Sequence, residues 1–133
     1  MGIKDYMIAT SIHCVINLRL SGKICPHCKE KADYPKDDLK ALGLTEAQIK
    51  NNIFYKGKGC GECGGTGLLG RIAIIEIFEN SKNIHDSILR GFDRKELINI
   101  AKKDRVYHTL TEDALKKFMN GDIDFDEVRR YII

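Results

Sequence analysis

The sequence predicts an α+β fold composed mainly of short helices with a small β element. Two Cys-x-x-Cys pairs are separated by 31 residues, a spacing typical of distant loops that share one site. A β-branched run at 72–78 indicates a strand, and amphipathic segments with capping residues follow from Ser81 onward. We therefore expect a tetracysteine subdomain followed by a helical C-terminal subdomain.

The first predicted element is a helix over residues 5–20, because Ile8, Ile12 and Ile16 recur at helical spacing. Apolar residues also occupy its other faces, which predicts burial on several sides. Cys14 is then expected to be a small, inert core residue in mid-helix. A chain that begins with so buried a helix is expected to have a packing partner outside these residues.

Loops and short helices are predicted between this helix and the strand. Residues 21–35 read as a loop, and a short helix should open at Pro35 and end at Gly43. Thr45 and Gln48 form the pattern of a capping box at the start of a second short helix. After strand-like residues 53–56, a glycine-dense run leads into the strand at 72–78, which should be covered on both sides.

Four amphipathic helices are predicted for the remainder of the chain. The first contains Ile84 and Ile88 and ends at Gly91, and the second begins with a capping pair, Asp93 and Glu96. Thr111 should cap the third and Asp124 the fourth.

Composition and charge favour a compact domain without an export signal. The net charge of +3 gives no support for a nucleic-acid partner, which would need a clearly basic face. The apolar stretch from Tyr6 to Leu20 is too polar and too short to span a bilayer, and Asp5 before it argues against a signal peptide. A reducing compartment favours metal ligation over disulfides.

The cysteine pattern predicts a structural zinc site. Two residues between cysteines let one tight turn present both sulfurs to one ion, and two such turns complete a tetrahedron. Four sulfurs leave no open coordination position, so the ion should be structural. We expect Gly61, Gly64 and Gly65 to let backbone N–H groups approach the sulfurs. The predicted ligands are Cys25, Cys28, Cys60 and Cys63.

Other interpretations of these residues stay open at this point. The cysteines could be buried, disulfide-bonded, iron–sulfur ligands or redox thiols, although two pairs at this separation favour zinc. His27 could replace one cysteine, but its place inside the turn points it away from the sulfurs. The remaining histidines are expected to be surface or capping residues: His13, His85 and His108.

No catalytic or cofactor-binding motif is recognisable in the sequence. Residues 64–67 (Gly-Gly-Thr-Gly) lack the lysine and the following helix of a phosphate loop. Neither His-Glu-x-x-His nor Gly-x-Ser-x-Gly occurs. We therefore expect no catalytic residue in this chain and no enzymatic activity from it alone.

Five segments resemble motifs of one known family, in the same order. They are residues 1–11, close to Met-Gly-Val-Glu-Pro-Phe-Leu-Ile-Ala-Ser-Ser; 15–25, close to the Gln-Arg-Leu segment before Cys-Pro-x-Cys; 60–70, the second Cys-x-x-Cys knuckle; 70–76, close to Gly-Arg-x-Gly-x-x-Glu; and 109–115, close to Thr-Leu-x-Glu-Asp-Gly-Leu. Together they make the chain resemble the C-terminal portion of the ATPases that power type II secretion and type IV pilus assembly.

The resemblance implies a piece of a hexameric, ATP-hydrolysing motor at the cytoplasmic face of the bacterial inner membrane. It implies three parts: residues 1–24 ending the nucleotide-binding core, 25–69 forming the zinc-binding subdomain, and 70–133 forming a strand and the helical C-terminal subdomain. It further implies that ATP and Mg²⁺ bind only in the full-length motor, and that the partners are the rest of that motor and an inner-membrane platform protein.

Some positions depart from the family pattern. Leu18 stands where Gln is usual, and Ala73 and Ala114 where Gly is usual. These departures weaken any nucleotide-contacting role for Arg19 or Arg71, which we interpret as structural salt-bridge or helix-end arginines.

Two further function classes compete with the motor fragment. The segment from Cys60 to Gly67 also resembles one cysteine-rich repeat of Hsp40 co-chaperones, which carry four such repeats where this chain has one. A nucleic-acid-binding zinc ribbon is the third candidate, but only Lys56 and Lys58 lie beside the second knuckle.

Overall fold

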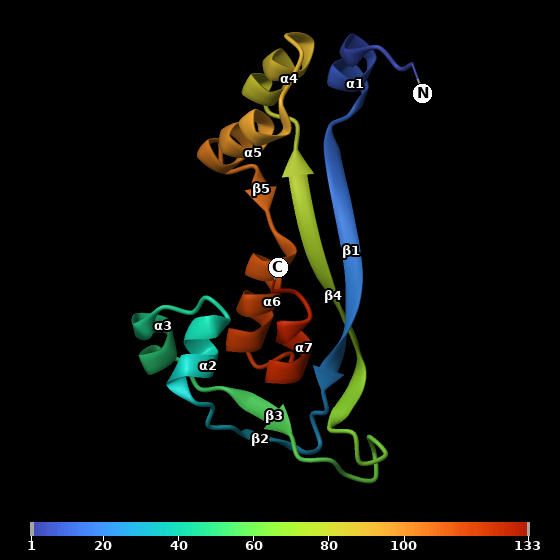
Figure 1. Cartoon of the computed structure of the whole chain (residues 1–133). Helices are drawn as coiled ribbons and strands as arrows, with labels where there is room; N and C mark the ends of the chain where they lie inside the picture. The colour runs from blue at the N-terminus through green and yellow to red at the C-terminus, as the bar shows by residue number, and fades with distance from the viewer. Residues whose placement is uncertain (1, 133) are drawn as a thin grey trace. The chain divides into compact units, whose positions relative to one another are not determined.

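The computed structural model describes residues 2–132, which form an α+β fold as predicted (Figure 1). The chain divides into two compact units. Unit 1 contains the residues up to Leu18 together with Ile75–Thr109, and unit 2 contains Arg19–Ile74 and the residues from Leu110 onward. These two units are groups of residues in contact. They do not test the predicted domains 1–24, 25–69 and 70–133, which stay a prediction.

Short helices and two small sheets alternate along the chain. The elements are α1 Asp5–Ser11, β1 Cys14–Ile24, β2 Lys29–Lys31, α2 Lys36–Ala41, α3 Glu46–Asn51, β3 Tyr55–Gly57, β4 Leu68–Glu79, α4 Lys82–Leu89, α5 Arg94–Lys103, β5 Tyr107–His108, α6 Leu110–Met119 and α7 Phe125–Arg129. One sheet has the strand order β1-β4-β5, and the other pairs β2 with β3 antiparallel.

The predicted helix over residues 5–20 is wrong for most of its length. The helix α1 ends at Ser11, and residues from Cys14 onward form the strand β1 (Figure 1). From Ile16 to Ile24, apolar residues or glycine alternate with polar residues, which is the period of a strand, and this strand pairs with β4. The predicted burial is also wrong, because Cys14 is exposed and the side chains of Val15 and Ile16 are 53% and 59% exposed.

Unit 1 is held by a small apolar core and by one asparagine. Its core contains Ala9, Ile84, Ile88 and Ala101. The Asn80 amide donates to the carbonyl oxygens of Ala9 and Ile12, at 2.9 and 2.7 Å, and so fixes the end of α1. Among residues 2–132, no helix is both long enough and apolar enough to cross a membrane.

The predicted helix caps of unit 1 hold in part. Ser81 accepts from the backbone of Ile84 and begins α4, and Asp93 accepts from Lys95 and begins α5. Glu96 does not complete a capping pair with Asp93, because its carboxylate accepts instead from the hydroxyl of Ser87 on α4.

Unit 2 has the larger core, in which four aromatic rings meet. The rings of Phe54 and Phe118 stack at 4.9 Å between centroids, and those of Tyr34 and Phe125 at 5.0 Å. The capping box of Thr45 and Gln48 at α3 is confirmed.

The last two helices also belong to unit 2. Asp124 caps α7, accepting from the backbone of Glu127. Thr111 does not cap α6, which begins at Leu110; its hydroxyl donates instead to the carbonyl oxygen of Tyr131 at 2.6 Å.

A buried carboxylate ties the end of β1 to α7 within unit 2. Glu127 is 4% exposed and accepts from the Ser21 hydroxyl and the Gly22 backbone N–H, both at 2.7 Å. Arg130 reaches the second carboxylate oxygen at 2.8 Å. A buried charge with this many donors holds its position firmly, because moving it leaves several donors unsatisfied.

Replacing Glu127 with alanine should destabilise unit 2. Glu127→Ala leaves the Ser21 hydroxyl and the Gly22 N–H buried without an acceptor, at an expected cost of about 3 kcal/mol in the free energy of unfolding. The exposed Glu79 provides the control, since Glu79→Ala should change it by less than about 0.5 kcal/mol. Urea unfolding followed by circular dichroism measures both. Equal effects of the two substitutions would contradict the assignment.

Candidate metal centre

Three strand ends bring the four cysteines to one place in unit 2. Cys25 directly follows β1, Cys28 precedes β2, and Cys60 and Cys63 lie in the loop between β3 and β4. Lys29 of β2 pairs with Gly57 of β3, so the chain leaving β3 passes beside the first cysteine pair.

Backbone hydrogen bonds fasten these segments to one another. The Lys58 N–H donates to the Cys28 carbonyl at 3.0 Å, and the Cys25 N–H donates to the Gly67 carbonyl at 2.9 Å. The two cysteine loops are therefore joined by main-chain contacts as well as by their side chains.

The four sulfurs form a compact cluster. The Sγ atoms of Cys25 and Cys60 are 3.9 Å apart, those of Cys28 and Cys63 are 3.9 Å apart, and those of Cys60 and Cys63 are 3.7 Å apart. All four lie within 4.8 Å of one another. A tetrahedral ion with metal–sulfur bonds of about 2.3 Å requires sulfur separations of about 3.8 Å. The cluster therefore has the dimensions needed to hold one tetrahedral metal ion.

These distances also separate metal ligation from the disulfide interpretation. A disulfide bond requires about 2.05 Å between sulfurs, and all five cysteines are free. Cys25 is fully buried and Cys63 is 8% exposed, so the cluster is closed on that side. His27 is exposed and lies outside the group of possible ligands.

Backbone donors surround the sulfurs, but they are not the glycines that the sequence suggested. The N–H of Gly59 donates to Cys28 Sγ at 3.3 Å, and the N–H groups of Cys60 and Gly67 donate to Cys63 Sγ at 3.2 Å. The expected donors, Gly61, Gly64 and Gly65, do not take this role. The N–H groups of Gly64 and Gly65 donate instead to backbone carbonyls within the knuckle.

Burial and hydrogen bonding act in opposite directions on two of the thiols. Burial raises the pKa of Cys28 to about 12, because a thiolate loses its hydration there. The backbone N–H of Cys60, with that of Gly67, lowers the pKa of Cys63 to about 6. The negative charges of neighbouring thiolates repel one another. A divalent cation at the centre would compensate the charge of several thiolates together.

Two glycines allow the β3 end and the β4 start to approach closely. A Cβ atom on Gly57 would overlap the Gly67 carbonyl oxygen, and one on Gly67 would lie 2.5 Å from the Gly57 oxygen. Gly67 also has φ of +76°, a conformation that favours glycine. A signal for these roles was present in the sequence, because both glycines flank the second cysteine pair at short distance.

The two arginines that a nucleotide-contacting role would involve lie on strands, outside the sulfur cluster. Arg19 lies on β1 and Arg71 on β4, and both are exposed. Among residues 2–132, no ion pair involves either side chain, so the interpretation as structural salt-bridge or helix-end arginines is wrong.

The architecture defines a class of small domain in which four cysteines on strand ends hold two loops together. Comparison with known proteins places this class in a family. A family model described as "Type II/IV secretion system protein" matches residues 1–130. The chain therefore belongs to the type II/IV secretion system protein family, as the sequence motifs indicated.

Individual relatives agree with this assignment. The type IV pilus assembly ATPase PilB of Thermus thermophilus is 37% identical over 96% of this chain and 14% of its own length. PilB of Pseudomonas aeruginosa is 31% identical over 98% of this chain and 23% of its own length. Type II secretion system protein E of Klebsiella pneumoniae is 28% identical over 98% and 25%, respectively. The chain thus spans a quarter or less of these relatives.

The close approach of β3 and β4 makes Gly57 a sensitive position. Gly57→Ala should destabilise unit 2 by about 3 kcal/mol or more, because the new methyl group meets the Gly67 backbone, which has no room to withdraw. Gly61→Ala is a matched control, since a Cβ there has nothing within 4 Å. Denaturant unfolding of the two variants tests this. The close approach would be refuted if both variants were as stable as the parent chain.

Proposed function

We propose that this chain is the C-terminal, zinc-binding portion of a secretion or pilus assembly motor ATPase, and that it acts as a structural, force-transmitting module. The observation that carries the proposal is the convergence of four sulfurs in a chain of this family. The curated relatives named above are described as ATPases of pilus assembly or as a type II secretion protein.

Zinc is the proposed occupant because of the ligand set. Four thiolates suit a soft or borderline ion, and tetrahedral sulfur coordination is typical of structural zinc. The four ligand sulfurs would hold the ion closed to water and substrate. The backbone donors to Cys28 and Cys63 would disperse the remaining negative charge.

The proposed mechanical role follows from what the metal would join. The segment from Lys58 to Gly67 contains little regular structure, and the β2–β3 ladder has only three residue pairs. A two-stranded ladder this short is marginal in water without further support. An ion bound by all four sulfurs would lock the ends of β1, β2 and β3 into one rigid body, which is what transmission of movement requires.

We place ATP hydrolysis in the remainder of the motor rather than in this chain. The sequence contains no phosphate-loop motif, which supports this placement. In the full-length context we propose a homo-hexamer at the cytoplasmic face of the inner membrane, with the rest of the ATPase and a membrane platform protein as partners. Nucleic acid is not among the proposed partners.

The purified chain should contain one zinc ion per molecule. Cys25→Ser removes a buried ligand and should abolish stoichiometric zinc and loosen residues 25–63, because zinc binding of this kind contributes about 10 to 16 kcal/mol. Cys14→Ser is the matched control, since Cys14 is exposed on β1 and lies outside the cluster. Elemental analysis and the ultraviolet–visible spectrum measure the outcome. Iron with sulfide, or zinc retained by Cys25→Ser, would overturn the zinc assignment.

The same chain should show no ATP turnover. In the full-length motor, the cysteines should be needed for pilus extension rather than for ATP hydrolysis. In a full-length pilus assembly ATPase, serine at the four equivalent cysteines should abolish pilus extension while the protein still hydrolyses ATP. Phosphate release and a twitching assay measure the two properties. Turnover by this chain alone, or normal pilus extension without the cysteines, would refute the proposed function.

A further inference from the structure

We infer that a basic groove along α2 and α3 of unit 2 is a docking site for an acidic, amphipathic peptide segment of a partner protein. This basic groove comprises two adjoining recesses that are lined only by residues within 31–54, so it belongs wholly to unit 2. The inference goes beyond the proposed function, which assigns no surface of this chain to a partner.

The two recesses of the groove share part of their lining. One has a volume of about 310 Å³ and the other about 350 Å³. Lys36 of α2 and Ile49 of α3 line both of them, so the recesses adjoin at these two short helices. Each volume is at the lower end of the range for ligand sites, which suits one or two side chains of an incoming peptide.

Lysines give the groove a net positive charge. Four lysines and two carboxylates line it, so its net charge is +2 (four minus two). They are Lys31, Lys36, Lys40 and Lys50 against Asp33 and Glu46. The Lys40 ammonium pairs with Glu46 at 2.8 Å. Among the described residues no ion pair involves the other three lysines, so three ammonium groups can receive an anionic partner.

Apolar side chains form the rest of the contact surface. Leu39 and Phe54 are 2% and 6% exposed and belong to the core of unit 2, and Ile49 packs against that core. Ile53 lines the first recess and is 52% exposed. An uncharged occupant would take the ammonium groups out of water without compensation, and a purely charged one would leave Ile53 uncovered. The groove therefore fits a segment that combines apolar residues with carboxylates.

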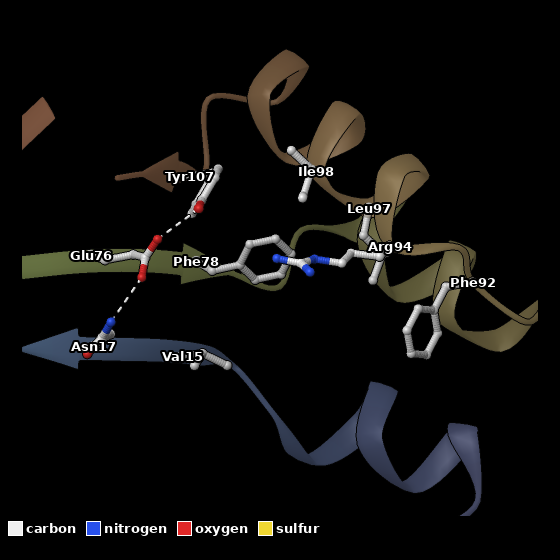
Figure 2. Close-up of a pocket in the computed structure, with 9 residues that line it drawn as sticks. All are labelled: Val15, Asn17, Glu76, Phe78, Phe92, Arg94, Leu97, Ile98 and Tyr107. Carbon is white, nitrogen blue, oxygen red and sulfur yellow. Dashed lines mark hydrogen bonds between the residues drawn. The ribbon is translucent and has the colours of Figure 1, made fainter. Parts of the chain in front are cut away.

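Three other recesses among the described residues are balanced in charge. The recess of unit 1 drawn in Figure 2 is lined by one cation and one carboxylate, Arg94 and Glu76. This carboxylate accepts from the Asn17 amide at 3.2 Å and from the Tyr107 hydroxyl at 2.8 Å (Figure 2). Two further recesses each contain one lysine or arginine and one aspartate. The excess of positive charge thus distinguishes the α2–α3 surface from these recesses.

The shape of the groove favours a peptide over a membrane surface. An amphipathic helix that lies on a bilayer presents its apolar face to the lipid. Here Leu39 of α2 and Ile49 of α3 pack in or against the core of unit 2, and Ile53 is the exposed large apolar residue within 31–54. A flat bilayer would not reach the buried apolar lining, whereas a peptide side chain can enter a recess.

A peptide-binding measurement on the purified chain tests the occupant. The probe is a short fluorescent peptide of glutamate and leucine, compared with a second peptide in which glutamine replaces every glutamate. The acidic peptide should bind at low salt with a Kd of about 100 μM or tighter, and at least about tenfold more tightly than its glutamine counterpart. Fluorescence anisotropy measures both affinities. Equal affinities, or no binding of either peptide, would overturn the inference.

Charge reversal tests the location. Lys36→Glu with Lys50→Glu changes the net charge of the groove from +2 to −2 and should weaken binding of the acidic peptide at least about tenfold. Lys82→Glu with Lys95→Glu makes the same change at exposed lysines of unit 1 and should alter the affinity less than about twofold. Circular dichroism shows that each variant keeps its fold. Equal losses in the two variants would mean attraction to the whole chain and would refute a docking site.

A change without charge tests the apolar contact. Ile53→Ser should weaken binding of the acidic peptide at least about threefold, because the occupant covers this side chain. Leu89→Ser is the matched control, since Leu89 is 48% exposed and lies in unit 1. Unchanged affinity of Ile53→Ser would contradict the predicted contact.

Vesicles of phosphatidylcholine and phosphatidylglycerol test the membrane alternative. The groove should not bind them, so Lys36→Glu with Lys50→Glu should leave sedimentation of the chain with these vesicles unchanged. Sedimentation that this pair abolishes, in a chain that does not bind the acidic peptide, would overturn the inference in favour of a lipid surface.

The docking inference and the proposed function fail separately. Zinc content measured on the same samples reports the metal site alone. One zinc per chain without peptide binding would overturn the docking site only, whereas peptide binding by a chain that holds no zinc would overturn the zinc assignment only.

Discussion

The cluster of four sulfurs depends on main-chain hydrogen bonds that hold two distant loops of unit 2 side by side. The cysteine pairs are far apart in sequence, and closing so long a loop costs conformational entropy that the three-pair β2–β3 ladder cannot offset alone. Main-chain bonds from Cys25 to Gly67 and from Lys58 to Cys28 set the loops side by side. The sulfur positions follow from that framework, and an ion at their centre would add a bond to each strand end.

Glycine makes this framework possible, and the aromatic core supports it. The β3 and β4 backbones touch at Gly57 and Gly67 because neither residue has a side chain. Phe54, which directly precedes β3, stacks on Phe118, so the β2–β3 ladder is anchored to α6. The site is thus built between a close backbone contact and a packed core, and these supply rigidity that surface loops seldom have.

Local signals in the sequence predicted a large part of this structure. The capping box of Thr45 and Gln48, the cap at Asp124 and the strand at 72–78 depend on residues near one another in the chain. The grouping of the cysteines also followed from spacing alone. The strand β1 also carried a local signal, which the helix prediction missed, because apolar residues or glycine alternate with polar residues from Ile16 to Ile24. By contrast, the sulfur donor Gly59 depends on how two distant loops meet, because its N–H reaches Cys28 of the other loop.

β1 connects these features through a single piece of backbone. Its first residues, Cys14–Leu18, belong to unit 1, its later residues bind Glu127 through Ser21 and Gly22, and Cys25 directly follows its end. The Glu127 carboxylate fixes β1 just before the first cysteine of the cluster. The position of Cys25 is therefore set by side-chain contacts of β1 as well as by its own main-chain bond to Gly67.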